Sequence, residues 1–154
     1  MMATASASSP VRRAAWIAAL AGTIPFIVAT GAMLRGDSHI RIPAIAALVT
    51  LSAVVIASLG GMQLGLGVRG DDARDRVRAL ALFIGALVSL AAWAIPWLPS
   101  PQMQLGCALA LFVAAWIADL GLARAGLLPG WFMRLRTMAT LVVAVTLAVA
   151  LYLL

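Results

Sequence analysis

The chain has 154 residues, of which 64% are hydrophobic, and its mean hydropathy is +1.08. Soluble domains are about 45–50% apolar, so this composition excludes a water-soluble globular protein and predicts one membrane domain. The net charge of +6 comes from eleven Arg against five Asp, with no Lys and no Glu. We interpret it as an orientation signal in the bilayer and not as a nucleic-acid-binding surface.

The chain offers little material for chemistry. Cys107 and His39 are its only cysteine and histidine. Zinc is usually held by several Cys or His ligands, and a nucleophilic triad needs a base beside its nucleophile. We therefore predict no metal, no cofactor and no catalytic residues, and a disulfide within the chain is impossible.

The first segment combines a polar start with an apolar run. Residues 1–11 are small and polar and indicate a disordered tail, and Arg12-Arg13 precede an uncharged run over 14–34. We interpret this run as a retained first membrane helix, because it is longer than the apolar part of a signal peptide and Pro25 interrupts it. A cleaved signal peptide and a mitochondrial presequence remain alternatives.

Four more membrane-length runs follow. A polar loop at 35–41 leads into the second run, and Pro43 opens it, because Pro is tolerated at the first helical position. Residues 79–118 carry no charge, which is about twice the ~20 residues that one span needs. The prolines between 96 and 101 must therefore divide them. The predicted spans are 14–34, 43–68, 78–97, 102–122 and 131–154, all in one domain over residues 12–154.

The distribution of Arg predicts the orientation. With five spans, the tail contributes two Arg to one side, the 69–78 loop four and the 124–136 loop three, against two on the other side. The positive-inside rule then places the N-terminus in the cytoplasm and the C-terminus outside. Aromatic residues agree with this all-α, five-helix topology, because they fall near both interfaces. The inner set is Trp16, Trp116 and Trp131, and the outer set is Trp93, Trp97 and Tyr152.

Small residues mark one side of the second span. Ala53, Ala57, Gly61 and Gly65 recur at every fourth position, and Gly60 precedes the third of them. Helices in lipid associate through close packing, which such a smooth stripe permits. We expect a packing seam within the bundle, with an interface to a second copy or to another subunit, or a ligand contact, as alternatives.

A few polar residues lie inside or beside the apolar runs. Gln63 and Asp119 are the two whose side chains most disfavour lipid, and both lie toward the cytoplasmic ends of their spans. We predict that Asp119 forms a structural ion pair with Arg136, with a proton or substrate relay as the alternative. Arg134 and Arg136 are also expected to snorkel to the headgroups. Trp131, beside them, completes the set of polar or ligand-binding candidates.

Two short motifs match known sites in the wrong context. Residues 65–70 fit a dinucleotide-binding fingerprint, but they follow a membrane-length run and not a strand. Asp71, Asp72 and Asp75 have the DDxxD form with which isoprenoid-transferring enzymes hold magnesium diphosphate. The chain has no second acidic motif, so we interpret these residues as a helix cap and as partners of nearby Arg.

Three segments together resemble a known family. They are Gly22-Thr-Ile-Pro-Phe26, Ser58-Leu-Gly-Gly-Met-Gln-Leu-Gly65 and Pro129-Gly-Trp-Phe-Met-Arg-Leu-Arg136. In this order they resemble the integral membrane family that includes transmembrane protein 69, with bacterial and mitochondrial members. That family usually has His or Arg followed by Trp where this chain has Gln63 and Leu64. The resemblance implies a small integral membrane protein and brings no established activity.

The sequence therefore leaves several functions open. We expect a non-catalytic accessory or interaction subunit of a membrane complex, in the bacterial inner membrane or, in a eukaryote, the mitochondrial inner membrane. The alternative is a small transporter or a lipid- or quinone-binding protein, which needs a cavity that reaches Gln63, Asp119 and Arg136. A transferase that uses Asp71, Asp72 and Asp75 is a third class. Expected partners are membrane lipids, other membrane subunits or a second copy, and no nucleic acid.

Overall fold

The structure is a computed structural model, and it describes residues 10–35, 37–68 and 75–154. Five helices in these ranges are long and apolar enough to cross a membrane, which confirms the predicted all-α membrane bundle. A short 3₁₀ helix, η2, joins two of them. The helices are α1 (Pro10–Met33), α2 (Ser38–Val68), α3 (Asp75–Ala94), η2 (Ile95–Trp97), α4 (Pro101–Arg124) and α5 (Gly130–Tyr152).

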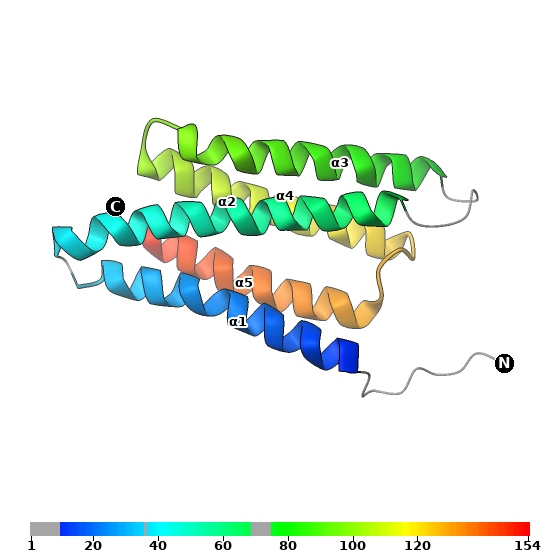
Figure 1. Ribbon diagram of the computed structural model, residues 1–154, viewed down its shortest axis with the longest axis horizontal. Helices are drawn as coiled ribbons and strands as arrows, with labels where there is room; N and C mark the ends of the chain where they lie inside the picture. The colour runs from blue at the N-terminus through cyan, green and yellow to red at the C-terminus, as the bar shows by residue number, and fades with distance from the viewer. Residues whose placement is uncertain (1–9, 36, 69–74) are drawn as a thin grey trace.

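The five long helices form two layers (Figure 1). Helices α3, α2 and α1 lie side by side in one layer, and α4 and α5 form the other. Helix α2 packs against α1, α3 and α4, and α5 packs against α1 and α4. Because the helix number is odd, α1 begins and α5 ends at opposite ends of the bundle. Which end faces the cytoplasm stays a prediction.

The predicted helix boundaries differ from the structure most at the starts of α1 and α2. Helix α1 begins at Pro10, so the predicted tail over 1–11 overlaps its first turn. Helix α2 begins at Ser38, five residues before Pro43, and the prediction that Pro43 opens it was wrong. Asp37 explains the earlier start, because its carboxylate accepts the His39 amide at 3.0 Å and its carbonyl accepts the Arg41 amide at 2.8 Å. These bonds satisfy amides that a helix N-terminus leaves without partners.

The two turns on either side of α4 are built from local hydrogen bonds. Before α4, the Ser100 side chain caps the helix by accepting the backbone amide of Met103, and the side-chain amide of Gln104 donates to the carbonyls of Pro96 and Leu98. After α4, Gly126 has a φ of 77°, a left-handed conformation that favours glycine. The short turns hold α4 antiparallel to α3 and α5.

Glycines bring α2 and α3 into backbone contact. A methyl group on Gly60 would lie 2.6 Å from the Gly85 carbonyl oxygen, and one on Gly67 would lie 2.9 Å from the Arg78 carbonyl oxygen. Ser89 adds a hydrogen bond from its hydroxyl to the Ala57 carbonyl at 3.3 Å. In lipid, where apolar burial drives little association, such close approach holds helices together.

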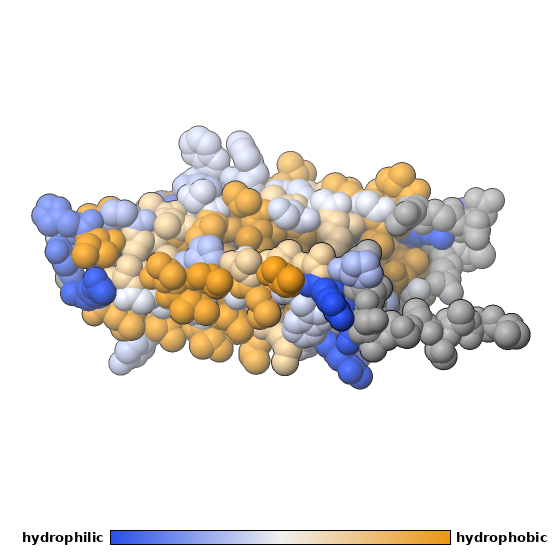
Figure 2. All heavy atoms as spheres, turned by 60° about the horizontal axis from the view of Figure 1, so that its bottom comes forward, coloured by the Kyte–Doolittle hydropathy of each residue, from blue (hydrophilic) through white to orange (hydrophobic). Residues whose placement is uncertain are grey.

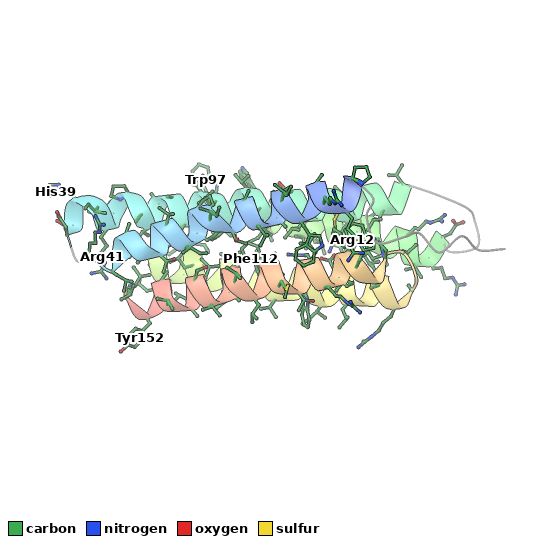
Figure 3. The ribbon with its side chains drawn as sticks, turned by 90° about the horizontal axis from the view of Figure 1, so that it is seen from below. Arg12, His39, Arg41, Trp97, Phe112 and Tyr152 are labelled. Atoms are coloured by element: carbon green, nitrogen blue, oxygen red, sulfur yellow. The ribbon has the colours of Figure 1, made fainter. Side chains whose placement is uncertain are left out.

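The interior and the outer surface are both apolar in the middle of the bundle. Phe26 and Phe112 meet edge to face in the core, with ring centres 6.1 Å apart, and Figure 3 shows Phe112 between the two layers. Large apolar side chains are also exposed on every long helix, and Figure 2 shows that they cover the middle of the face in view while polar residues gather near the ends. This pattern is typical of a surface in contact with hydrocarbon.

Hydrogen bonds tie the end of α5 to its neighbours. The Arg41 guanidinium donates to the Leu153 carbonyl, one of the last in the chain. Thr30 in α1 donates to the Thr146 carbonyl in α5 at 3.4 Å. Figure 3 places Arg41, His39 and Tyr152 toward one end of the bundle and Arg12 toward the other. A hydrogen bond thus links the second half of α1 to α5.

Candidate functional site

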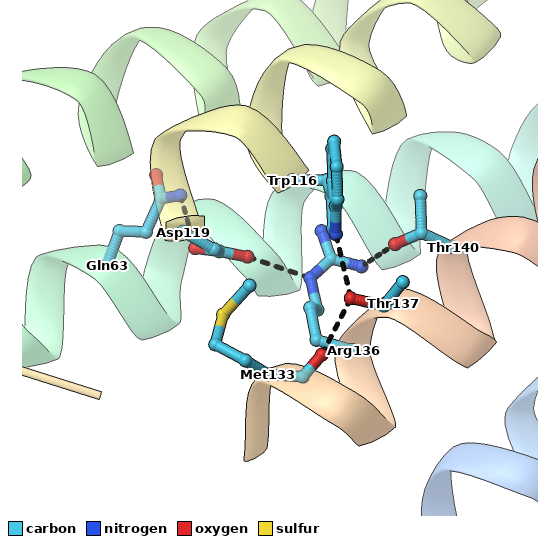
Figure 4. Close-up of polar contacts among 7 residues, drawn as sticks. All are labelled: Gln63, Trp116, Asp119, Met133, Arg136, Thr137 and Thr140. Carbon is cyan, nitrogen blue, oxygen red and sulfur yellow. Dashed lines mark hydrogen bonds and ion pairs between the residues drawn. The ribbon is translucent and has the colours of Figure 1, made fainter. Parts of the chain in front are cut away.

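Side chains from three helices meet inside the bundle, at the end where α2 ends and α5 begins. The Gln63 amide of α2 donates to Asp119 Oδ1 of α4 at 2.8 Å, and Arg136 Nε of α5 donates to Asp119 Oδ2 at 2.8 Å. Arg136 Nη1 also donates to Thr140 Oγ1 at 2.9 Å. We call Gln63, Asp119, Arg136 and Thr140 the polar cluster (Figure 4). The predicted ion pair between Asp119 and Arg136 is confirmed.

The polar cluster is enclosed by protein. Gln63 and Asp119 have no exposed surface, and Arg136 is 6% exposed. The expectation that Arg136 snorkels to the headgroups was wrong, because Asp119 supplies its counter-charge inside the bundle. Arg134, two residues earlier, is exposed. An ionised pair survives away from water only when its charges are matched and its hydrogen bonds are made.

Each member of the cluster occupies a buried position in its helix. Asp119 follows Leu105, Ala108, Phe112 and Ala115 at steps of three or four residues, and Arg136 and Thr140 continue the same spacing in α5. Gln63 lies three residues after buried Gly60 in α2. These steps keep residues on one side of a helix, so the three helices turn their polar residues toward a common point.

A second polar contact joins α4 to α5 beside the cluster. The Trp116 indole donates to Thr137 Oγ1 at 3.0 Å, and that hydroxyl donates to the Met133 carbonyl at 2.8 Å. Figure 4 shows this contact next to Arg136. The tryptophan and the ion pair together fix the register of α5 against α4.

Two atoms of the cluster lack a hydrogen bond. Arg136 Nη2 and Gln63 Oε1 are buried, and neither has a partner among the described residues. An unsatisfied buried polar atom costs about 1–3 kcal/mol, and more when the group is charged. The cluster therefore has one unused donor and one unused acceptor, while its ion pair leaves it without net charge.

An apolar pocket adjoins the cluster. Its volume is about 360 Å³, and it lies between α1 and α5, with α2 and α4 closing the inner side. Arg136 forms part of its wall, but Gln63 and Asp119 do not line it, so the cavity expected of a binding protein reaches only one of these three residues. We call it the α1 pocket. Its lining also includes Ala18, Ala19, Gly22 and Thr23 of α1, Met62 of α2, Phe112 of α4, and Phe132 and Ala139 of α5.

The α1 pocket reaches the outer surface of the bundle. Ala18 and Gly22 belong to its lining and are also exposed. A methyl group on Gly22 would meet nothing within 4 Å. A molecule dissolved in the bilayer can therefore enter beside the first half of α1 without crossing the core.

The other predicted polar candidates lie outside the cluster. Trp131 is half-buried and packs edge to face on Phe132, with ring centres 5.9 Å apart. Arg134 is exposed on the first turns of α5. Asp75 is exposed at the start of α3, and Asp71 and Asp72 lie outside the described residues. Within the described ranges, no three His, Cys, Asp or Glu side chains are grouped to hold a metal.

The predicted stripe of small residues is divided between two environments. Gly60 faces α3 in close contact, and Ala57 accepts the bond from Ser89. Ala53 and Ala57 also border a shallow hollow that Trp93 and Trp97 line. Gly61 and Gly65 are exposed, and added methyl groups there would meet nothing within 4 Å.

The sequence reasoning missed Thr140 and the α1 pocket. Thr140 had a local signal, because it lies four residues after Arg136 and can meet it on the same helical face. No local sequence signal indicated the pocket, because it depends on how α1 lies against α5. Its lining of Ala, Gly, Leu and Phe has the same composition as the packed core.

The polar cluster lies within a part of the chain that matches a family model. A family model described as "Protein of unknown function (DUF3429)" matches residues 11–152. The chain belongs to this DUF3429 family. The match includes all four residues of the polar cluster and the whole lining of the α1 pocket. Comparison with curated proteins and with solved structures gives no significant match.

Proposed function

We propose that this DUF3429 protein is a non-catalytic, multi-pass membrane protein that binds a lipophilic molecule in the α1 pocket. The observation that carries the proposal is an apolar pocket that opens on the outer surface and has the buried residue Arg136 in its wall. Ligand sites are typically apolar cavities of about 300–1,000 Å³ with a few placed polar groups. The α1 pocket has these properties.

The fixed half of the pocket favours a binding site over a loose gap. Phe112 and Arg136 stand in its wall, and both are held by contacts to other helices: Phe112 packs on Phe26, and Arg136 binds Asp119. On the α1 side, all lining residues except Phe26 are Ala, Gly or Thr, which leave room for a ligand. A rigid wall that faces a wall of mostly small residues can hold an apolar ligand taken up from the bilayer.

A photoactivatable phosphatidylcholine with a diazirine in its acyl chain tests the proposal in vesicles. The expected result is labelling concentrated on residues 15–26 and 132–143, as located by peptide mass spectrometry. Ala19→Phe places a ring in the pocket and is expected to reduce this labelling at least about fivefold. Ala21→Phe is the matched control, because Ala21 is exposed and does not line the pocket. Labelling spread evenly over the lipid-facing surface would contradict the proposal.

A second candidate is the accessory or interaction subunit of a membrane complex. The observation that favours it is the exposed pair Gly61 and Gly65, which leaves space for the backbone of another helix. Purification in mild detergent should then recover other chains or a second copy with the wild type and lose them with Gly61→Leu. Repeated recovery of the wild type as a lone monomer would count against it.

The setting of the protein is part of the proposal. The five spans support a multi-pass membrane protein, and the Arg distribution supports the bacterial inner membrane, or the mitochondrial inner membrane in a eukaryote. Kinship with transmembrane protein 69 is also proposed, on the three segments that resemble its family. Fractionation of native membranes tests the location.

A further inference from the structure

Arg136 has hydrogen-bonding capacity that the protein does not use. Its Nε and Nη1 atoms are bonded to Asp119 and Thr140, but Nη2 has no acceptor among the described residues. Nη2 is also closed off from water, so hydration does not replace the missing bond. Arg136 also forms part of the wall of the α1 pocket. A ligand oxygen that displaces a wall side chain slightly would supply the missing acceptor.

The charge of the site restricts which oxygen is suitable. Asp119 already neutralises Arg136 at 2.8 Å, and the other members of the polar cluster, Gln63 and Thr140, are uncharged. A carboxylate, sulfonate or phosphate would bring a second anion into an apolar site that has one cation. The desolvation of that anion would not be offset by a free counter-charge. A neutral carbonyl oxygen accepts the same hydrogen bond without this cost.

The rest of the pocket lining favours a ligand that is mostly apolar. Among the described lining residues, Thr23 is the only other one with a polar side chain, and its hydroxyl donates to the Leu20 carbonyl at 2.8 Å. Arg136 is therefore the one side-chain donor of the lining that remains available. The ligand should therefore have one hydrogen-bond acceptor, at the end that lies beside Arg136.

From this geometry we propose that the ligand of the α1 pocket is an electrically neutral lipophile whose carbonyl oxygen accepts a hydrogen bond from Arg136. An ester and a quinone both have this chemistry. The inference rests on the proposed function, because it presupposes that the α1 pocket is occupied. It adds the charge and the head group of the occupant.

Competition against the photoactivatable lipid in vesicles tests the inference with three probes of one chain length. Methyl hexadecanoate is neutral and has a carbonyl, hexadecanesulfonate is a permanent anion, and hexadecane has no acceptor. One hydrogen bond to a charged donor corresponds to about a tenfold change in affinity. Methyl hexadecanoate is expected to displace the label from residues 132–143 at about one tenth of the concentration that either other probe needs.

The outcomes separate this inference from the proposed function. Equal displacement by hexadecane would show a pocket that selects by shape alone, and stronger displacement by the sulfonate would show an anion site. Either result, or no displacement by any probe, overturns the neutral-carbonyl inference, while pocket labelling in the wild type still supports a binding protein. Absence of pocket labelling overturns both.

A change of one charge provides an independent test. Asp119→Asn removes the counter-charge of Arg136. The affinity for hexadecanesulfonate relative to methyl hexadecanoate should therefore rise at least about tenfold. An unchanged preference in a folded variant would contradict the inference. The wild-type competition decides the matter by itself if this variant does not fold.

Discussion

Gly60 in α2 and Gly85 in α3 lie back to back, so that the two helices touch through their backbones. A methyl group on Gly60 would lie 2.6 Å from the Gly85 carbonyl oxygen, and one on Gly85 would lie 2.6 Å from the Gly60 carbonyl oxygen. Backbone atoms cannot rotate away as a side chain can. Neither position can therefore accept even the smallest side chain without moving a helix.

Gly60→Ala is expected to lower the free energy of unfolding by about 1–3 kcal/mol, the usual cost of forcing a methyl group into a packed interface. Gly61→Ala is the matched control, since a methyl group there meets nothing within 4 Å, and its stability should stay within about 0.5 kcal/mol of wild type. Unfolding in detergent, followed by circular dichroism, measures both. Equal stability of the two variants would contradict the close contact.

The Asp119–Arg136 pair should behave as a coupled unit. Asp119→Asn leaves the Arg136 cation buried without its counter-charge, and we expect a loss of about 3 kcal/mol. Exchanging the two residues, as Asp119→Arg with Arg136→Asp, should recover part of that loss. A double-mutant cycle on unfolding in detergent measures the coupling, and additive effects would show that the pair contributes nothing.

Gln104 should stabilise the turn between α3 and α4. Its amide donates to the carbonyls of Pro96 and Leu98 at 3.1 and 2.9 Å, so Gln104→Ala is expected to cost about 1 kcal/mol. Gln102→Ala, two residues earlier on an exposed position, is the control. Hydrogen exchange of residues 97–104 should increase only in the first variant. An equal increase in both variants would show that faster exchange reflects helix propensity or solvation and not the loss of the Gln104 hydrogen bonds.

Topology offers a prediction independent of stability. With the arginine-rich end in the cytoplasm, alkaline phosphatase fused after Leu154 should be active in bacterial cells, and green fluorescent protein at the same site should be dark. A fusion in the loop at 126–129 should give the opposite pair of results. Fluorescence after Leu154 would show that the bundle is inserted the other way round.

The sequence predicted features that depend on span length and on neighbouring spans. Five apolar runs of membrane length were sufficient to predict the helices. The Asp119–Arg136 pair was within reach because a short turn returns α5 beside α4, only 17 residues further on. The hydrogen bond between Gln63 and Asp119 could not be predicted, because the two residues are 56 positions apart and nothing local indicates that α2 packs on α4.

The rotation of each helix about its own axis was the hardest feature to predict from the sequence. Successive residues of a helix differ by about 100°, so a stripe through Gly61 and a contact through Gly60 are on different sides of α2. Helix α2 is apolar all round, and its sequence gives no inward face to choose between them. The α1 pocket was unpredictable for a related reason, because it depends on the distance between two helices and not on the residues of either one.

The division of one ion pair between α4 and α5 affects how the chain enters the bilayer. Helix α5 carries Arg136 to an interior position, and the matching carboxylate arrives on α4, which is synthesised first. A lone α5 would expose an uncompensated cation to hydrocarbon, which insertion strongly disfavours. Helices α4 and α5 should therefore leave the translocon as a hairpin in which the charge of Arg136 is already neutralised by Asp119, and α4 acts as the template on which α5 integrates.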